Sequence, residues 1–397
     1  MRLGKDFYDK IKENELYRMA YDCLHCGSCA SIWPLEHRCS LSAMYQSNEA
    51  NAQGLNRIMQ EILEDKLMFS EGLVDFIFRC TTCDLCRVNC PGHLRPRDYI
   101  ESLRKDLVEE GEVPKIVMEV FESALKYGNV WGKPKDQRSK WAEGLKIKTV
   151  SEAEDFEYLL FVGDSSSYVD RNQETAKKFV NILNKAGVKF AYLGNEERSS
   201  GNEILRMGEE GLFESLAEEN IANFKKYGVK KIIALSPHSF HALKNEYPKL
   251  DPDLNIEVLH YTQCLNALIK QGKIKLKKKV NKKVTYQDPC YLAKHNSIYE
   301  EPREILHAIP GLELIEMEFI KEKGVCCGGG GGGVWIERGD GTKVEDFRFN
   351  EAIDLNVDAI ATACPFCTQM LEAAKEEYGD SNIEIKDIIE LVYEAQF

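Results

Sequence analysis

The segment that decides the fold contains three cysteine motifs: Asp288-Pro289-Cys290, Cys326-Cys327-Gly328 and Cys364-Pro365-Phe366-Cys367. Soft thiolate ligands select iron–sulfur clusters, zinc or copper(I), so five thiols in this short span predict a metal site. An adjacent cysteine pair is a poor match for a zinc knuckle, which uses two spaced pairs. Five thiols also exceed the four that an ordinary cubane cluster takes.

Five further glycines follow Gly328, as far as Gly333. A glycine run alone is typical of a flexible loop. Without β-carbons, however, the backbone can approach an inorganic group closely and adopt positive φ angles. Its amides can then point at cluster sulfides as they point at other anions. Next to Cys326-Cys327, the run favours a cofactor-binding role for Gly328 and Gly329.

The three motifs together resemble the CCG domain of heterodisulfide reductase catalytic subunits. The domain is shared by iron–sulfur oxidoreductases that accompany glycolate, lactate and glycerol-3-phosphate dehydrogenases and electron-transferring flavoproteins. The resemblance implies that one noncubane [4Fe-4S] cluster is held at a site where a disulfide is cleaved. It assigns the catalytic and ligand roles to five residues: Cys290, Cys326, Cys327, Cys364 and Cys367.

A second group of cysteines precedes residue 91. The run Cys80-x2-Cys83-x2-Cys86-x3-Cys90-Pro91 reproduces the bacterial ferredoxin signature, in which the fourth cysteine serves the other cluster. The earlier run, Cys23-x2-Cys26-Gly27-x-Cys29, departs from it because Trp33-Pro34 occupies the place of the fourth cysteine. Structural zinc is the alternative for these spacings.

Cys39 is the spare thiol near these runs. We predict two cubane [4Fe-4S] clusters with four ligands each: Cys23, Cys26, Cys29 and Cys90 for one, and Cys39, Cys80, Cys83 and Cys86 for the other. The alternative is a three-iron cluster that leaves Cys39 unused.

Apolar periodicity predicts an α+β multidomain chain. Residues 1–110 are expected to be helical and resemble the α-helical ferredoxin domain of fumarate reductase iron–sulfur subunits. Residues 111–155 form a connector in which Trp131 and Trp141 pack between modules. From residue 156, apolar runs alternate with helical segments, the α/β pattern. Strands are predicted at 158–162, 188–193, 231–235, 283–287, 312–317 and 358–363.

An internal repeat divides the α/β part into residues 156–272 and 283–397. Ser199-Ser200-Gly201 matches Cys326-Cys327-Gly328, and Ser236-Pro237-His238-Ser239 matches Cys364-Pro365-Phe366-Cys367, with Gly163-Asp164-Ser165 opposite Asp288-Pro289-Cys290. Serines rarely hold such a cluster, because a hydroxyl has a much higher pKa than a thiol. The first repeat is therefore predicted to be a structural, degenerate CCG module. His238 and His241 either line a docking face or cleft there or are satisfied loop histidines.

The second repeat is expected to be the reactive one. Cys290 and Cys364 each follow an apolar strand, and strand carboxyl ends converge in a crevice. Pro365 opens a helix whose N-terminal amides favour the thiolate form of nearby cysteines. Tyr291 and His295 come just after Cys290 and are predicted to donate hydrogen bonds to sulfide or substrate, so His295 is assigned to cofactor binding. Cys264 is interpreted as a packed helix cysteine, with a redox role as the alternative.

Composition excludes several classes of function. The net charge is −13 and the pI about 5.3, with one basic run, Lys273 to Lys283, interpreted as a solvated linker or a docking site for an acidic flavoprotein. Nucleic-acid binding is therefore disfavoured. The start has no apolar signal segment and no run approaches the ~18–20 residues of a membrane span, so a cytoplasmic protein is predicted, with its cysteines as metal ligands rather than bridges.

Two functional hypotheses follow. No dinucleotide or P-loop motif is found, so bound FAD, NAD or nucleotide is disfavoured and electrons must be exchanged with a separate protein. In the first hypothesis the chain is an electron-transfer adaptor for a flavoprotein dehydrogenase, an electron-transferring flavoprotein or other subunits of a heterodisulfide-reductase-like complex. In the second it reduces a disulfide or quinone directly at the CCG cluster. Because only one repeat retains its cysteines, the adaptor is favoured.

Overall fold

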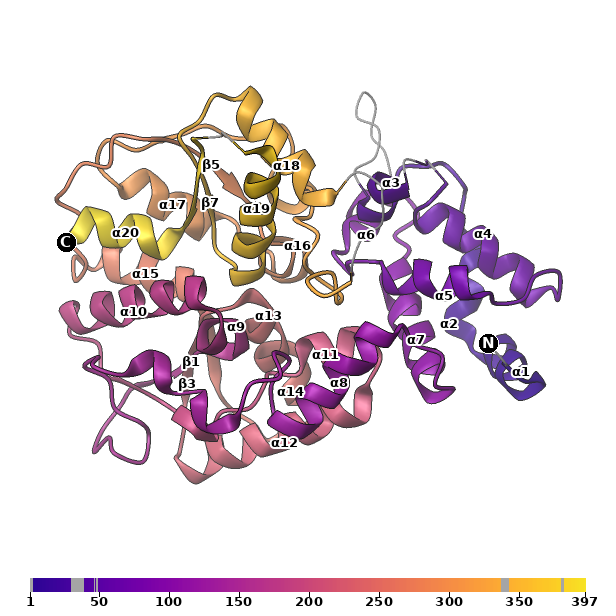
Figure 1. The fold of residues 1–397 in the computed structure, drawn as a ribbon, viewed down its shortest axis with the longest axis horizontal. Coiled ribbons are helices and arrows are strands. Elements are labelled where there is room, and N and C mark those ends of the chain that lie inside the picture. The colour runs from indigo at the N-terminus through magenta and orange to yellow at the C-terminus, as the bar shows by residue number, and fades with distance from the viewer. Residues whose placement is uncertain (1–2, 30–38, 46, 48, 337–342, 380–381) are drawn as a thin grey trace.

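The computed structural model describes residues 3–29, 39–45, 47, 49–336, 343–379 and 382–397. Figure 1 shows a helical N-terminal region beside two α/β repeats, which are stacked on each other. Trp33 and Pro34, which were matched to the missing fourth cysteine position, lie outside the described residues. Within the described residues, no helix is both long and apolar enough to span a bilayer.

The N-terminal region is built from short helices joined by the cysteine-bearing loops. The helices are α1 (Lys5–Glu13), α2 (Glu15–Arg18), α3 (Ser40–Tyr45), α4 (Ala52–Leu63), α5 (Glu71–Phe78), α6 (Leu85–Asn89) and α7 (Pro96–Glu109). Asn51 and Ser70 accept hydrogen bonds from the first amides of α4 and α5, as side chains before a helix commonly do. Pro96 opens α7, a position where a proline fits because the first helical N–H has no partner within the helix.

Helix α8 (Lys115–Tyr127) and two short 3-10 helices, η2 (Lys135–Gln137) and η3 (Lys140–Ala142), connect this region to the first repeat. Trp141 packs edge-on against Tyr192 with ring centroids 5.8 Å apart, and Trp131 packs on Trp335 at 5.4 Å. Both tryptophans therefore make contacts between parts of the chain, as their positions in the connector predict.

The two α/β repeats contain parallel sheets with the same strand order. The strands of the first are β1 (Tyr158–Phe161), β2 (Phe190–Tyr192), β3 (Lys231–Ala234) and β4 (Glu257–His260), and those of the second are β5 (Lys283–Gln287), β6 (Glu313–Leu314), β7 (Ala359–Thr362) and β8 (Glu384–Asp387). The orders are β2-β1-β3-β4 and β6-β5-β7-β8. This correspondence agrees with the internal repeat found in the sequence. The sequence prediction missed β4 and β8, which are four-residue strands with partly exposed side chains.

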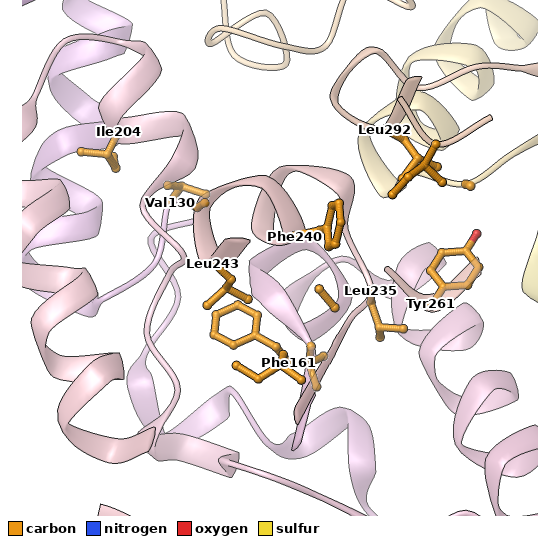
Figure 2. Close-up of a cluster of buried hydrophobic side chains, with 14 of the residues drawn as sticks. Val130, Phe161, Ile204, Leu235, Phe240, Leu243, Tyr261 and Leu292 are labelled. Atoms are coloured by element: carbon orange, nitrogen blue, oxygen red, sulfur yellow. The ribbon is translucent and has the colours of Figure 1, made fainter. Parts of the chain in front are cut away.

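Helices cover both sheets. Those of the first repeat are α9 (Gly163–Tyr168), α10 (Asp170–Lys185), α11 (Asn202–Arg206), α12 (Glu210–Lys226), α13 (Pro237–His241), α14 (Tyr247–Leu250) and α15 (Tyr261–Lys270). Those of the second are α16 (Cys290–Asn296), α17 (Glu300–Ala308), α18 (Val344–Asp354), α19 (Pro365–Tyr378) and α20 (Ile388–Gln396). Figure 2 shows part of the largest buried core, which includes Phe161 and Phe240 of the first repeat and Leu292 of the second.

The repeats pack on each other in a reciprocal way. Helix α13 of the first repeat contacts α16 of the second, and α19 of the second contacts α9 of the first. Polar contacts reinforce this: Tyr261 donates to Asp387 at 2.8 Å, and Arg171 donates to Glu372 at 2.6 Å. Because α13 and α19 follow equivalent strands, the loops after those strands meet at the boundary between the repeats.

The lysine-rich linker between the repeats is less solvated than the sequence suggested. The amides of Lys277 and Lys278 both donate to the Ala395 carbonyl at 2.9 Å, and Ile274 and Val280 are buried. The linker is thus attached to the end of α20. Cys264 is buried on α15 among apolar neighbours, in agreement with its interpretation as a packing residue.

Candidate metal centres

The structure brings together all five cysteines of the second repeat. Cys290 begins α16 directly after β5, and Cys364 precedes α19 directly after β7. Cys326 and Cys327 come from the loop between β6 and α18. Interactions between thiols run from Cys290 to Cys326, Cys327, Cys367 and Cys364 in turn, with 3.2 Å between the Sγ atoms of Cys327 and Cys367. All five side chains are buried, so strand ends and one loop converge on a closed, sulfur-lined site.

Backbone amides from the glycine run face these sulfurs. The Gly328 N–H donates to Cys326 Sγ at 3.2 Å, and the Gly329 amide donates to the Cys327 thiol. A hydrogen bond from Cys290 lowers the pKa of Cys326, and one from Cys326 lowers the pKa of Cys327. Gly328 and Gly329 therefore lie beside two of the thiols that we predict to be ligands.

Cys364 receives its support from two directions. Burial alone would raise its pKa, but hydrogen bonds from Cys367 and from His238 lower the pKa of the thiol to about 5. His238 belongs to the first repeat. Burial disfavours its charged form, yet contacts with Cys364 and Glu203 raise the pKa of His238 to about 9.

The N-terminal cysteines lie in two neighbouring groups. Cys23, Cys26, Cys29 and Cys90 line one cavity, which Cys86 also borders. Of these, Cys26 is exposed and the others are half-buried.

The second group is more deeply placed. Cys39 packs beside Cys80, and it lies close enough to Cys80 and Cys83 for their charges to raise its pKa. The pKa of Cys86 is also raised, first by burial and then by nearby charges that include Cys80, Cys83 and Cys39. These four sulfurs are thus mutual neighbours.

The donor sets fit iron–sulfur clusters. Burial raises the pKa of Cys39, Cys80 and Cys86, and interaction with Cys326 and burial raise that of Cys83, so crowded bare thiolates would be unfavourable here. Iron must bind the deprotonated form and would supply the positive charge that offsets this repulsion. All-sulfur donor sets are those that iron–sulfur clusters use.

The second N-terminal group lies directly against the CCG cysteines. Cys83 packs with Cys290, Cys326 and Tyr291 in one buried cluster, and its thiol interacts with Cys326. Sequence spacing gave no indication of this contact, because it joins two regions far apart in the chain.

Part of the glycine run serves this contact. A β-carbon on Gly330 would lie 2.5 Å from the Thr81 carbonyl oxygen, and one on Gly331, whose φ is +58°, would lie 2.5 Å from the Cys80 carbonyl oxygen. The close approach that the glycines permit is therefore to the N-terminal cysteine loop as well as to the CCG sulfurs.

Arg104 holds the same junction together. Its guanidinium is fully buried. Within the described part of the chain, it donates hydrogen bonds to backbone carbonyls. The acceptors come from three parts of the chain: Ile77, Phe78 and Cys80, then Arg206, then Gly331.

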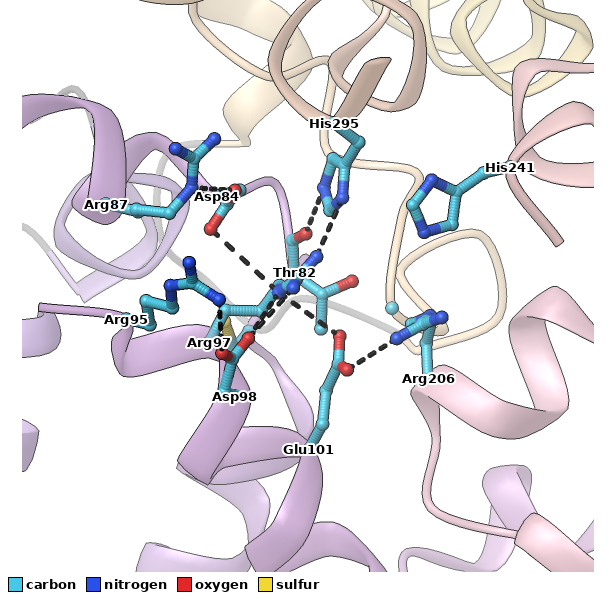
Figure 3. A network of polar contacts seen from close by, with 12 residues as sticks. Thr82, Asp84, Arg87, Arg95, Arg97, Asp98, Glu101, Arg206, His241 and His295 are labelled. Atoms are coloured by element: carbon cyan, nitrogen blue, oxygen red, sulfur yellow. Dashed lines mark hydrogen bonds and ion pairs between the residues drawn. The ribbon is translucent and has the colours of Figure 1, made fainter. Parts of the chain in front are cut away.

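His295 braces the boundary between the N-terminal region and the second repeat (Figure 3). Arg97 can only donate, so it donates to His295 Nδ1 at 2.8 Å, and His295 Nε2 then donates to the Thr82 carbonyl at 3.0 Å. The ring stacks on Tyr291 with centroids 4.2 Å apart, and the Tyr291 hydroxyl is 3.0 Å from that of Thr82. His295 Nδ1 thus contacts Arg97 on α7, and Nε2 contacts the Thr82 carbonyl in the cysteine-bearing loop. Both nitrogens are engaged with the N-terminal region rather than with the CCG thiols.

Known protein families match both cysteine-bearing parts of the chain. Residues 19–94 match the 4Fe-4S dicluster domain family, and residues 162–244 and 284–372 each match the cysteine-rich CCG domain family. The chain is 33% identical to the D-type polypeptide of the dihydromethanophenazine:CoB–CoM heterodisulfide reductase of Methanosarcina mazei, over 94% of this chain and 93% of that protein. The chain belongs to the D-type heterodisulfide reductase family.

Other relatives of this family member are longer. It is 40% identical, over 80% of its length, to the probable iron–sulfur-binding oxidoreductase FadF of Bacillus subtilis, and 36% identical, over 89%, to the EtfAB:quinone oxidoreductase of Syntrophomonas wolfei. The matches cover 46% and 50% of those two proteins. The chain thus spans about half the length of these relatives. The dicluster and CCG domains fit cubane clusters plus a noncubane cluster, as the sequence predicted.

The first CCG repeat of this heterodisulfide reductase relative has a cavity lined by serines in place of the cysteines of the second repeat. Six serines gather around one cavity, at which Pro365 and Phe366 of the second repeat also lie: Ser165, Ser166, Ser199, Ser200, Ser236 and Ser239. These are the serines that the internal repeat matches to the cysteines, together with Ser166.

The sequence did not reveal the contacts that His238, Cys83 and Arg104 make between modules. For His238 a signal was present: the repeat matches it to Phe366, inside the motif that carries Cys364 and Cys367. The contacts of Cys83 and Arg104 across the junction had no such signal.

Proposed function

We propose that the chain is an iron–sulfur subunit of a heterodisulfide-reductase-like complex that relays electrons between an external flavoprotein and a second redox partner. The observation that carries this is the continuity of the cysteine groups from surface to interior. Exposed Cys26 marks the outer end, Cys86 borders the same cavity, and Cys83 contacts Cys326 in the buried CCG site. A one-electron relay requires carriers in such close succession.

The proposed ligand sets follow the same groups. Cys23, Cys26, Cys29 and Cys90 would hold the outer cubane, Cys39, Cys80, Cys83 and Cys86 the inner cubane, and the five CCG cysteines one noncubane cluster. When bound, these groups supply one-electron carriers. The chain would bind them, exclude water from the CCG cluster, whose five cysteines are buried, and fix their order. The corresponding modules are residues 1–110, a connector at 111–155, a ligand-free repeat at 156–272 and a cluster-binding repeat at 283–397.

An electron-transferring flavoprotein is the favoured partner class. The name of the Syntrophomonas relative describes an oxidoreductase between EtfAB and quinone, and the chain matches half of that protein. The half-exposed outer cysteines are the place for a flavin-bearing partner to dock, because electron transfer needs close approach.

Free thiols in this number also fit a reducing compartment, so we assign the relay to the cytoplasm.

Direct reduction of a disulfide or quinone at the CCG site is the second candidate. The match to the D-type heterodisulfide reductase polypeptide over nearly its whole length favours it. Against it, the first repeat offers serines where a second set of cysteines would lie. The family resemblance implies that two cluster-bearing repeats share disulfide cleavage. This chain has cysteines in only one of them, so the relay is the better-supported function.

The two candidate functions are distinguished with the anaerobically prepared chain that holds all of its clusters. It would be reduced with a low-potential donor and mixed in a stopped-flow instrument with disulfides, a menaquinone analogue or an oxidised electron-transferring flavoprotein. The relay predicts rapid reoxidation by the flavoprotein and no catalytic turnover with the small acceptors. Turnover with a disulfide or quinone that Cys326→Ser abolishes and the matched variant Cys264→Ser retains would overturn the relay in favour of direct reduction.

A further inference from the structure

His238 of the first repeat lies against the CCG site of the second. It occupies the position in Ser236-Pro237-His238-Ser239 that Phe366 occupies in Cys364-Pro365-Phe366-Cys367. The reciprocal packing of the repeats brings the two rings together, with centroids 4.8 Å apart and an interplanar angle of 65°. The other face of the imidazole lies on Tyr291, with centroids 4.2 Å apart. The ring is therefore held between two aromatic side chains of the cysteine-bearing repeat.

The polar contacts of His238 fix its orientation. Its Nδ1 atom lies 2.8 Å from Glu203 Oε1 and 3.2 Å from Asn202 Nδ2, and Glu203 is itself buried on α11. With Nδ1 directed at this carboxylate, the hydrogen bond between His238 and Cys364 is left to Nε2. A sulfur that ligates iron carries no proton, so the hydrogen in that contact belongs to the imidazole. Nδ1 is thus engaged by Glu203 and Asn202, and Nε2 is left to donate to Cys364.

Such a contact has a defined electrostatic consequence. Reduction adds negative charge to an iron–sulfur centre, and hydrogen bonds to its sulfurs stabilise that charge. A donor that is paired with a carboxylate on its far side is held in a fixed orientation, as is common for groups around metal ligands. Charge-assisted hydrogen bonds to thiolate-like acceptors are also stronger than neutral ones. Loss of the donor should make the centre harder to reduce.

We propose that His238 is a positioning residue through which the cysteine-free repeat sets the reduction potential of the CCG centre, by donating a hydrogen bond to Cys364. The first repeat then contributes a residue to the site even though its own thiol positions are serines. The inference rests on the proposed function in one respect, namely that the five CCG cysteines hold a redox-active cluster.

His238→Phe tests it, since phenylalanine is the residue at the matched position and can keep the ring contacts with Phe366 and Tyr291. The readout is the midpoint potential of the CCG centre in an anaerobic redox titration followed by electron paramagnetic resonance. The expected result is a shift of about 59 mV to more negative potential, which is a tenfold change in a one-electron equilibrium constant. The N-terminal centres, titrated in the same samples, should keep their potentials.

His241→Phe is the matched control, because His241 lies on the same helix and is equally buried. The ring nitrogens of His241 contact Asn245, Asn296 and Glu246. This variant should leave the CCG potential unchanged. An iron-replete His238→Phe protein with the wild-type potential would overturn the inference.

A second variant covers loss of the cluster. If His238→Phe fails to retain iron, Glu203→Gln decides, since it keeps His238 and removes the carboxylate that orients it. A smaller shift in the same direction supports the inference, and an unchanged potential overturns it. Wild-type protein whose five CCG cysteines hold no redox-active centre would overturn the proposed function and this inference together, whereas the variants address the inference alone.

Discussion

At the scale of single residues, Cys39 determines whether the inner N-terminal group is a complete four-thiol set. The Cys39 thiol lies beside Cys80 and Cys83, so Cys39→Ala should convert one [4Fe-4S] centre to a three-iron form. Iron analysis should show a loss of about one iron, from roughly twelve for three four-iron centres, and electron paramagnetic resonance should show the new centre. Cys264→Ala is the control for removing a buried thiol. An unchanged cluster inventory in Cys39→Ala would exclude Cys39 as a ligand.

His260 gives a pH-dependent contribution to stability. It is fully buried, and burial lowers its pKa from 6.5 to about 3. Between these values the unfolded chain binds a proton that the folded chain does not, so stability is fully present above pH 6.5 and falls as pH decreases toward 3. The slope is at most about 1.4 kcal/mol per pH unit.

His260→Asn should flatten this slope. Asparagine can still accept the hydrogen bond that the Thr262 amide donates at the start of α15, but it does not titrate. The measurement is native-state hydrogen exchange of the α15 amides at pH 7.5 and 5.5. Equal pH slopes in the two proteins would contradict the prediction, whatever the difference in their absolute stability.

At the scale of elements, the glycine run joins two cysteine loops. Gly331→Ala should cost more stability than left-handed backbone strain alone, because its β-carbon would lie 2.5 Å from the Cys80 carbonyl oxygen. Gly228→Ala is the matched control: its φ is +63°, and nothing lies within 4 Å of the added carbon. We expect about 1 kcal/mol for the control and about 2–4 kcal/mol for Gly331→Ala.

Thermal unfolding under anaerobic conditions compares the two variants. The Gly331 variant should also broaden or shift the signal of the inner N-terminal centre, since Cys80 must move. Equal losses of stability, with an unaltered signal, would show that the close approach of the two loops is unimportant.

At the scale of the whole molecule, the two parts should depend on iron to different degrees. The described N-terminal elements are helices and loops that carry eight thiols, whereas each repeat contains a four-stranded parallel sheet. Anaerobic removal of iron with a chelator should therefore abolish hydrogen-exchange protection in residues 19–94 while the strands of both sheets remain protected. Restoring iron and sulfide should restore protection. Uniform loss throughout the chain would contradict this view.

Local sequence patterns determined much of this protein. The spacing of Cys80, Cys83 and Cys86 predicts cluster ligation because three thiols on one short loop can reach one metal group, and Cys90 is assigned to the other cluster. Apolar periodicity predicted a helical N-terminal region and strands at the positions of β1, β2, β3, β5, β6 and β7, and the internal repeat predicted two equivalent α/β modules. Strands β4 and β8 escaped because short, partly exposed strands carry little periodic signal.

Only the tertiary structure decided how these parts meet. It brought Cys83 to Cys326, directed Arg104 at carbonyls from three regions, and turned His238 toward Cys364. These contacts join residues remote in sequence, and they depend on the docking of whole modules rather than on any local preference of the chain. Sequence therefore specified which residues can hold iron, and packing specified how the sites connect.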